Sequence, residues 1–375
     1  SSDLTKSLTG ETKLKLGIPR VLNVYENFPF WAALFANCGI ELLVSPRSRQ
    51  SIAELGAGTV ASDNICFPAK LAHGHVIDLL SRGADRIFYP MVTFESASAD
   101  GSSNCFNCPV VSGYPDVLRN SVFGRARSVG VLDTPHISFR DEKLLARSVL
   151  RYLRGLGISS SIARKALRKA IEAQAEYREA IALRAAEIIA TNEAAGKTYA
   201  VIASRPYHID PLINHGVFDI FSDFGIDTVT EDAVALSQDM CIDDAQVLTQ
   251  WAYPNRLIHA AKFAASSKHA ELIQLNSFGC GPDSIMIDEV RDILETAGKK
   301  HTLLRIDELS AHGSLKLRVR SFAESTSTPK AQPRPKPRIS TPEFISADKR
   351  KTIIVPHFSD FHSSYITAPF AAMGY

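Results

Sequence analysis

Three cysteines occupy three separate turn-rich segments, and together they could do metal chemistry. Cys66 is followed by Phe-Pro, Cys108 by Pro, and Cys280 by Gly-Pro. Thiolate sulfur favours zinc or an iron-sulfur cluster, and three thiolates leave one coordination position open for water or substrate. The pattern therefore predicts a metal site assembled from distant loops.

The segments around Cys66 and Cys280 are typical of ligands. Cys66 precedes Pro68 at the predicted start of a helix, where the helix dipole and free N–H groups should lower a thiol pKa. Cys280 lies between two glycines after a predicted strand, so the backbone could approach a bulky cluster closely. The alternatives are a small buried side chain at Cys66 and a phosphate-binding turn at Cys280.

The other cysteines leave the ligand set open. Cys105 forms a C-x2-C pair with Cys108, and this spacing fits zinc, iron-sulfur and redox chemistry equally. Cys38 is predicted to be a core residue, and Cys241 could be a surface residue, a core residue or an extra ligand. Six cysteines in 375 residues are too sparse for a disulfide scaffold, so metal binding is the preferred hypothesis.

Polar candidates for catalysis lie after two predicted strands. Arg205 and His208 belong to a dense polar segment at residues 204–216, where they could bind an anion or donate protons near a cluster. Glu26 follows the first predicted strand and could face the same cleft. The alternatives are turn-supporting hydrogen bonds for Arg205 and His208, and a capping role for Glu26.

The elements that must position these residues alternate between strands and helices. Residues 16–22 and 40–45 are predicted strands around a helix near 30–39, and the rhythm returns after residue 197. Such alternation predicts parallel sheets. The expected fold class is α/β, with two Rossmann-like lobes joined by a helical segment and the cluster site in the cleft between the lobes.

Composition shifts predict six parts along the chain. Pro, Lys, Ser and Thr dominate one linker, and the final segment repeats the order and spacing of the first strand and helix. The parts are a disordered or linker segment at 1–13, a first α/β lobe at 14–140, a helical bridge at 141–195, a second α/β lobe at 196–323, a Pro-rich linker at 324–348, and the start of a further α/β domain at 349–375.

Bulk properties exclude several classes of partner. Lys and Arg total 42 against 40 Asp and Glu, so the net charge of +2 gives no case for nucleic acid or an anionic membrane. The sequence has neither an apolar stretch of spanning length nor a signal peptide, so we expect the cytoplasm. There is no P-loop and no G-x-G-x-x-G after a strand, which leaves ATP and dinucleotide binding unsupported.

Six motifs in order resemble one known family, the uncharacterised domain associated with acyl-CoA dehydratase activases, over about residues 14–322. The motifs are Tyr25-Glu-Asn-Phe-Pro-Phe-Trp, Cys66-Phe-Pro-Ala-Lys-Leu-Ala-His-Gly-His, Asn107-Cys-Pro-Val-Val, Arg205-Pro-Tyr-His-Ile-Asp-Pro, Asn214-His-Gly and Gln274-Leu-Asn-Ser-Phe-Gly-Cys-Gly-Pro-Asp. Three features depart from the family pattern: Ser204 replaces a common Gly, Pro282-Asp replaces Leu-Asp, and Cys105 is extra.

The resemblance implies a cofactor and partners. The family is similar to the subunits of 2-hydroxyacyl-CoA dehydratases, such as 2-hydroxyglutaryl-CoA dehydratase, in which three cysteines hold a [4Fe-4S] cluster. Cys66, Cys108 and Cys280 match those ligands. An ATP-dependent activase module and a second dehydratase-like domain, which residues 349–375 would begin, are expected on the same full-length chain.

The leading functional hypothesis is an iron-sulfur protein of bacterial-type anaerobic metabolism, which accepts electrons from the activase for low-potential reduction or dehydration of an acyl-CoA or small substrate. His208, Arg205 and Glu26 are its candidate proton or anion partners.

The alternative is a non-catalytic docking module with a closed metal site, completed by Cys105 or Cys241, that links the activase to a catalytic domain. A third hypothesis is a metal-free cleft for an anionic metabolite. Whether the chain is an enzyme, its substrate and any oligomeric state stay open.

Overall fold

The computed structural model describes residues 14–97, 100–123, 131–309, 312–326, 333, 345–357 and 359–374. The predictions for 1–13 and for most of the Pro-rich linker fall outside these ranges. The chain divides into two compact units, residues 1–336 and residues 337–375, and each is described by itself.

The first lobe of the larger unit is built on a parallel sheet with strand order β2-β1-β3-β5. A second, two-stranded parallel sheet of β4 and β6 extends from the same segments. The strands are β1 Lys15–Ile18, β2 Glu41–Val44, β3 Arg86–Phe88, β4 Met91–Phe94, β5 Val131–Asp133 and β6 His136–Ser138. The helices of this lobe are α1 Val24–Asn37, α2 Gln50–Ala57, α3 Phe67–Ser81 and α4 Pro109–Leu118, with a π-helical turn at Arg119–Phe123.

Helices cover both faces of the first sheet, which explains its apolar strands. Leu16 and Ile18 of β1 pack in one core with α1, whereas Ile87 of β3 packs in another core with α3 and α4. Successive strand residues face opposite sides of a sheet, so a short strand such as Arg86–Phe88 serves both cores.

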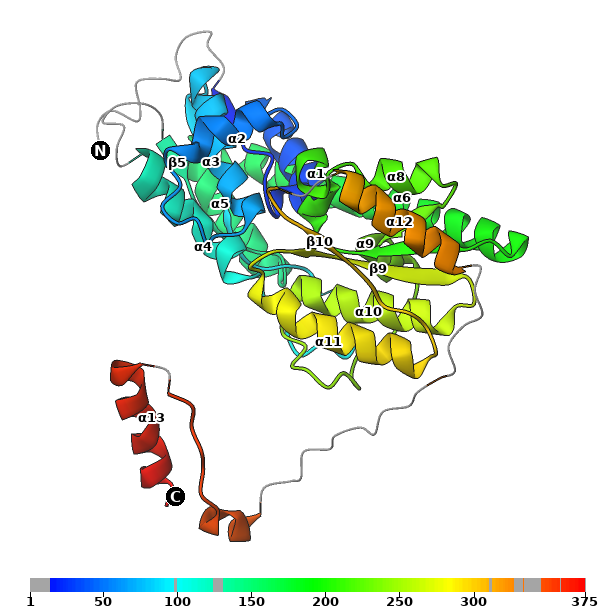
Figure 1. The fold of residues 1–375 in the computed structure, drawn as a ribbon. Helices are drawn as coiled ribbons and strands as arrows, with labels where there is room; N and C mark the ends of the chain where they lie inside the picture. The colour runs from blue at the N-terminus through cyan, green and yellow to red at the C-terminus, as the bar shows by residue number, and fades with distance from the viewer. Residues whose placement is uncertain are drawn as a thin grey trace. The chain divides into compact units, whose positions relative to one another are not determined.

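The second lobe has the same architecture, with parallel strand order β10-β9-β7-β8. Its strands are β7 Tyr199–Ala203, β8 Thr228–Thr230, β9 Ala270–Ser277 and β10 Thr302–Ile306. Its helices are α7 Pro211–Asn214, α8 Val217–Asp223, α9 Glu231–Ser237, α10 Ala252–Ser266, α11 Gly281–Thr296 and α12 His312–Thr326, and a 3-10 turn covers Pro206–Ile209. Figure 1 shows α10 and α11 on one side of this sheet and α8 and α12 on the other.

Alternation along β7 gives each face its core. Ala200 and Ile202 pack in the core that includes α8 and α12, whereas Tyr199, Val201 and Ala203 pack in the core that includes α10 and α11. The strand is buried at every position, as expected for the centre of a parallel sheet with helices on both faces.

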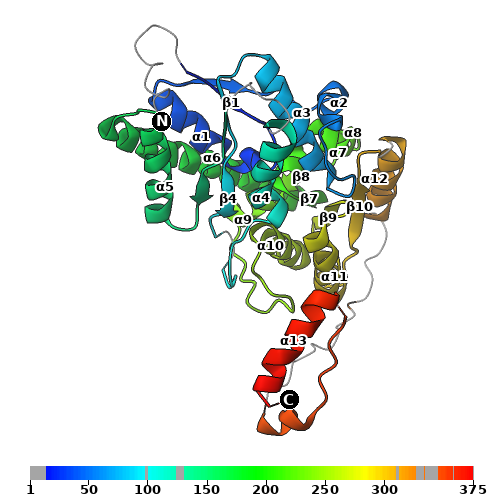
Figure 2. The same ribbon diagram turned by 90° about the vertical axis from the view of Figure 1, so that its left-hand side faces the viewer.

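Two helices connect the lobes, α5 Glu142–Gly155 and the long α6 Ser160–Ala195. Ser159 caps the start of α6 through its hydroxyl, and Gly196 ends it in the left-handed conformation with φ of 63°. Along its length α6 contacts α1 of the first lobe and α9 of the second. Figure 2 shows α1, α5 and α6 grouped together.

These elements confirm the predicted fold class, an α/β protein with parallel sheets in a Rossmann-like layout.

The smaller unit contains a 3-10 turn at Ser346–Arg350 and helix α13 Asp360–Ala372. Residues 351–357, where the repeated pattern predicts a strand, form none. A single short strand has no neighbour within this unit to complete its backbone hydrogen bonds, and it is not stable alone. None of the described helices has the length and apolar character needed to cross a membrane.

Candidate functional site

Each of the three predicted ligands is the N-cap residue of a helix. Cys66 precedes α3, Cys108 precedes α4, and Cys280 precedes α11, and each helix has a proline in its first or second position. Proline suits these positions because its fixed φ favours helix entry and its missing N–H has no intrahelical partner there. The free N–H groups and the positive dipole ends of three helices therefore lie beside three sulfur atoms.

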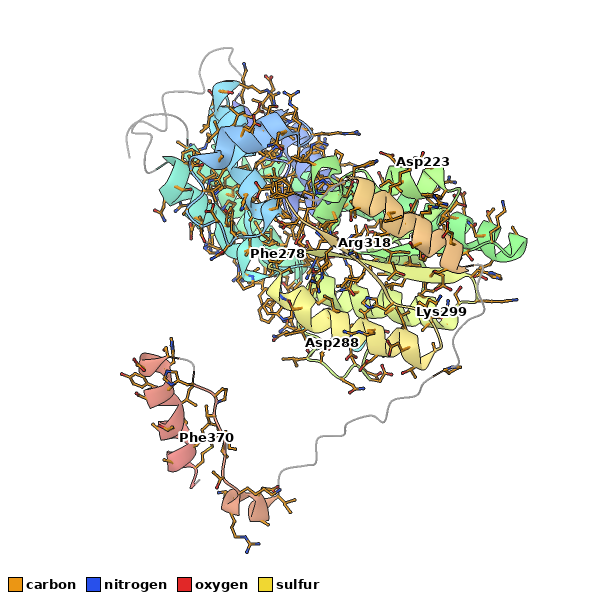
Figure 3. The ribbon with its side chains drawn as sticks, in the orientation of Figure 1. Asp223, Phe278, Asp288, Lys299, Arg318 and Phe370 are labelled. Atoms are coloured by element: carbon orange, nitrogen blue, oxygen red, sulfur yellow. The ribbon has the colours of Figure 1, made fainter. Side chains whose placement is uncertain are left out.

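The thiols come from both lobes. Cys66 and Cys108 belong to the first lobe, whereas Cys280 follows β9 of the second lobe. At the turn between β9 and α11, an added Cβ on Gly279 would lie 3.7 Å from the carbonyl oxygen of Asn64, two residues before Cys66. Phe278, labelled in Figure 3, is exposed in the same turn. The segments of Cys66 and Cys280 therefore adjoin across the two lobes.

The charges of all three cysteines act on one side chain, the phenol of Tyr207. Burial raises the pKa of the Tyr207 phenol well above its ordinary value, and the charges of Cys108, Cys66 and Cys280 add to the rise while Arg205 opposes it. The charge of Cys108 also acts on Cys66. The three predicted ligands therefore all lie within electrostatic range of Tyr207 and Arg205.

Arg205 supplies positive charge at this cluster of thiols. Its side chain is 3% exposed and forms a buried ion pair with Asp283, and its Nη2 lies 3.9 Å from the Cys280 sulfur. Burial disfavours the guanidinium, yet the charges of Asp283, Tyr207, Cys280 and Cys108 hold the pKa of Arg205 well above its ordinary value. Its Nε is buried without a hydrogen-bond partner among the described residues.

The expected lowering of the thiol pKa by the helix terminus is wrong for Cys66. Burial raises the pKa of Cys66 to about 11 and that of Cys280 to about 12. Nearby N–H groups and Arg205 oppose burial without cancelling it, because desolvation of a thiolate outweighs a few partial charges. A bound metal reverses this balance, since a coordinating thiol is deprotonated outright.

The remaining cysteines lie elsewhere. Cys105 is buried against Ala252 and Tyr253, and the charges that act on it after burial are those of Arg140 and Glu95. Cys241 is exposed, and Cys38 packs against the core of α1. Of the C-x2-C pair, only Cys108 is tied electrostatically to Cys66 in the contacts that the structure describes.

His208 is a buried connector between two strand ends. Its Nε2 lies 3.0 Å from the Ser277 hydroxyl at the end of β9, and its Nδ1 accepts a hydrogen bond from the Arg205 backbone N–H at 3.2 Å. Complete burial lowers the pKa of His208 to about 3, so the ring is neutral at physiological pH. The imidazole thus fixes the backbone of Arg205 relative to the segment that carries Cys280.

Glu26 lies in a buried ion pair that joins the lobes. Both of its carboxylate oxygens accept hydrogen bonds from Arg256 of α10, at 2.9 and 2.6 Å, and Arg178 of α6 lies 3.6 Å away. Although burial opposes ionisation, these two guanidinium groups hold the pKa of Glu26 below its ordinary value. Glu26 is therefore a carboxylate held between cations, separate from the thiols.

Several residues of this interface escaped the sequence analysis. Glu95 is fully buried and accepts hydrogen bonds from Asn27, Asn107 and Tyr253, and burial raises its pKa. Asn107 directly precedes Cys108, so the loop of that ligand is tied to a buried carboxyl group. Asp283 could have been found, because it lies three residues after Cys280 in the first turn of the helix that Cys280 caps.

The donor set fits an iron-sulfur cluster. No three His, Cys, Asp or Glu side chains within the described ranges are arranged to hold a single metal ion. A cluster has several iron atoms and holds its thiolates farther apart than one ion does, so this finding concerns a single ion and not a cluster. Helix N-termini and the Arg205 Nη2, 3.9 Å from the Cys280 sulfur, are donors of the kind that cluster sulfur accepts.

Comparisons with solved structures give distant similarity only. A metal-free periplasmic metal binding protein from candidatus Liberibacter asiaticus is 11% identical, with 83% of this chain and 99% of that chain covered and a TM-score of 0.23. A putative sugar binding protein from Salmonella typhimurium LT2 is 8% identical, with coverage of 83% and 84% and a TM-score of 0.21. Similarity at this level carries no functional argument.

The comparison with family models is specific. No curated protein matches the chain. The model of the CoA enzyme activase uncharacterised domain matches residues 15–234, which extend from β1 into α9 and include Cys66, Cys108 and Arg205. Cys280 lies beyond the matched range. Because the match covers more than half of the sequence, this chain belongs to the family of the CoA enzyme activase uncharacterised domain.

Proposed function

We propose that Cys66, Cys108 and Cys280 hold a [4Fe-4S] cluster, and that the chain accepts electrons from an ATP-dependent activase. The electrons would serve the low-potential reduction or dehydration of an acyl-CoA or another small substrate. The activase and a second dehydratase-like domain would lie on the same full-length chain. The family supports the association with an activase, because its description is that of a CoA enzyme activase domain.

One observation carries the proposal. Three thiols from distant segments each cap a helix, and their charges act together on Tyr207. A chance arrangement of half-buried cysteines would not require a helix N-terminus at every sulfur. Three convergent dipole ends stabilise negative charge, and a cluster with thiolate ligands carries that charge.

The surrounding residues would position the site. His208 and Ser277 hold the Arg205 backbone to the strand end that leads to Cys280. The Arg205 guanidinium, 3.9 Å from that sulfur, would favour the reduced state because it offsets added negative charge. When bound, the cluster supplies one-electron chemistry, and three protein ligands leave its fourth iron open to water or substrate.

A reducing compartment suits this chemistry. All six cysteines are described and none forms a disulfide. Free thiols and an oxygen-sensitive cluster would both persist in the cytoplasm, which we propose as the location.

The test is anaerobic purification, cluster reconstitution, and analysis of iron and acid-labile sulfide with an ultraviolet-visible spectrum. The expected result is about four irons per chain and a broad absorption band that bleaches on reduction. Cys66→Ser, Cys108→Ser and Cys280→Ser should each lose most of the iron. Cys241→Ser, at an exposed cysteine, is the matched control and should keep it.

Two outcomes would count against the proposal. Full iron occupancy in any of the three site variants would remove that cysteine from the ligand set. Bound zinc with no redox signal, together with loss of the fold on chelation, would instead favour a docking module with a structural metal.

A further inference from the structure

A cavity of about 150 Å³ lies between the two lobes, beside the thiols but distinct from them. It opens at the carboxyl ends of β7 and β8, where α/β sheets bind ligands. Arg205 is the residue that it shares with the thiol site. A cavity of this size holds a ligand about as large as benzene.

Among the charged side chains of the cavity wall, Arg178 has only long contacts with its partners. Glu26 is shared by two guanidinium groups, with close bidentate hydrogen bonds from Arg256 and a longer approach of 3.6 Å from Arg178. The other described bond of Arg178 is a long one to the Ser96 hydroxyl, at 3.4 Å. The Arg178 side chain is 28% exposed, so a bound anion can reach it.

A second wall group is a buried carboxyl that stays protonated. Glu231 is 1% exposed, and the hydrogen bonds from the Ser204 N–H and hydroxyl both reach its Oε2. Burial, with a contribution from the charge of Asp232, raises the pKa of Glu231 to about 8, while Arg256 and Ser204 oppose the rise. At neutral pH this carboxyl therefore offers an O–H donor.

A third donor is the Nε of Arg205, which is buried and has no hydrogen-bond partner among the described residues. Arg205 is 3% exposed and lines the cavity. An unpaired buried donor is costly, and a ligand oxygen would satisfy it. Apolar side chains complete the wall, namely Ile181, Pro206, Ile209, Ala235 and Leu236.

We infer that this cavity binds a small carboxylate with an apolar body, with the carboxylate held by Arg178, Arg205 Nε and the Glu231 hydroxyl. A cation would meet three guanidinium groups on the wall, those of Arg178, Arg205 and Arg256, and would require Glu231 to ionise. Asp232 also lines the cavity, but its charge acts on Glu231, Arg256 and Tyr177. The inference goes beyond the proposed function, because binding here needs no cluster.

The test compares three probes of nearly equal shape, namely butyrate, butyramide and butylammonium, by calorimetry on the full chain with and without reconstituted iron. We expect butyrate to bind at least about tenfold more tightly than either analogue. The preference should be the same in both preparations. Failure of the proposed function would appear as missing iron, whereas failure of this inference would appear as a lost preference for butyrate.

Variants locate the binding. Arg178→Gln should weaken butyrate about tenfold or more and leave butyramide unchanged, whereas Lys169→Gln, at an exposed position of the same helix, should change neither. Wild-type affinity for butyrate should fall as the pH rises through about 8, and Glu231→Gln should remove that fall. Tighter binding of butylammonium, equal binding of all three probes, or no binding at millimolar concentration would overturn the inference.

Discussion

The Arg205 guanidinium lies 3.9 Å from the Cys280 sulfur and is paired with Asp283, which is three residues after Cys280 in the sequence. A cation is therefore held beside a thiol by a carboxylate on the helix that the thiol caps. The ion pair with Asp283 therefore fixes the position of the Arg205 guanidinium beside the Cys280 sulfur. It also places one side chain against both the thiols and the cavity between the lobes.

The charge of Arg205 should tune the proposed cluster. Arg205→Gln removes a positive charge close to the thiols, so reduction becomes less favourable and the midpoint potential should become more negative. For one electron, a tenfold change in the equilibrium corresponds to about 59 mV. Arg205→Lys keeps the charge and is the control in a redox titration followed by electron paramagnetic resonance. Equal potentials for wild type and Arg205→Gln would exclude this role.

The pair of Glu26 and Arg256 should contribute strongly to stability. Glu26→Gln leaves the 3%-exposed Arg256 without its carboxylate, and loss of one partner of a buried pair costs about 3–5 kcal/mol. Urea unfolding measures the change. Glu187→Gln removes an exposed partner of Arg184 and should have little effect. Equal effects of the two substitutions would contradict the importance of the buried pair.

Local sequence signals were sufficient for the fold class and for the helix start at Cys66. Pro68 marks the first turn of α3, and apolar runs mark the central strands β1, β7 and β9, whereas the helix α4 that Cys108 caps was not predicted. The sequence analysis did not predict the short strands β4 and β6. Three or four residues carry too little periodicity to be distinguished.

Contacts between the lobes could not be predicted in the same way. Glu26 and Arg256 are 230 residues apart, and Glu95 and Tyr253 are 158 apart. No local pattern connects such partners, because only the packing of the two lobes brings them together. The pKa of Cys66 was also misjudged, since the degree of burial that raises it depends on the assembled structure.

Close packing of α2 against α3 should make Gly74 irreplaceable. A Cβ at Gly74 would lie 1.8 Å from the Ile52 carbonyl oxygen, and backbone atoms cannot move aside cheaply. Gly74→Ala should therefore lower the midpoint of thermal unfolding. Gly113→Ala, in α4 with no atom within 4 Å of the new Cβ, should stabilise by about 0.5–1 kcal/mol through helix propensity. A neutral Gly74→Ala would show that the two helices separate easily.

Glu231 should make stability depend on pH. Its pKa is raised from 4.5 to about 8 by burial, with Asp232 adding to the rise. The folded state therefore binds more protons between these values than the unfolded state, so the free energy of unfolding should fall as the pH rises from 4.5 to about 8. One proton gives a slope of at most about 1.4 kcal/mol per pH unit. Urea unfolding across this range should show a shallower decline for Glu231→Gln than for wild type, and parallel curves would mean that Glu231 is ionised in the folded protein.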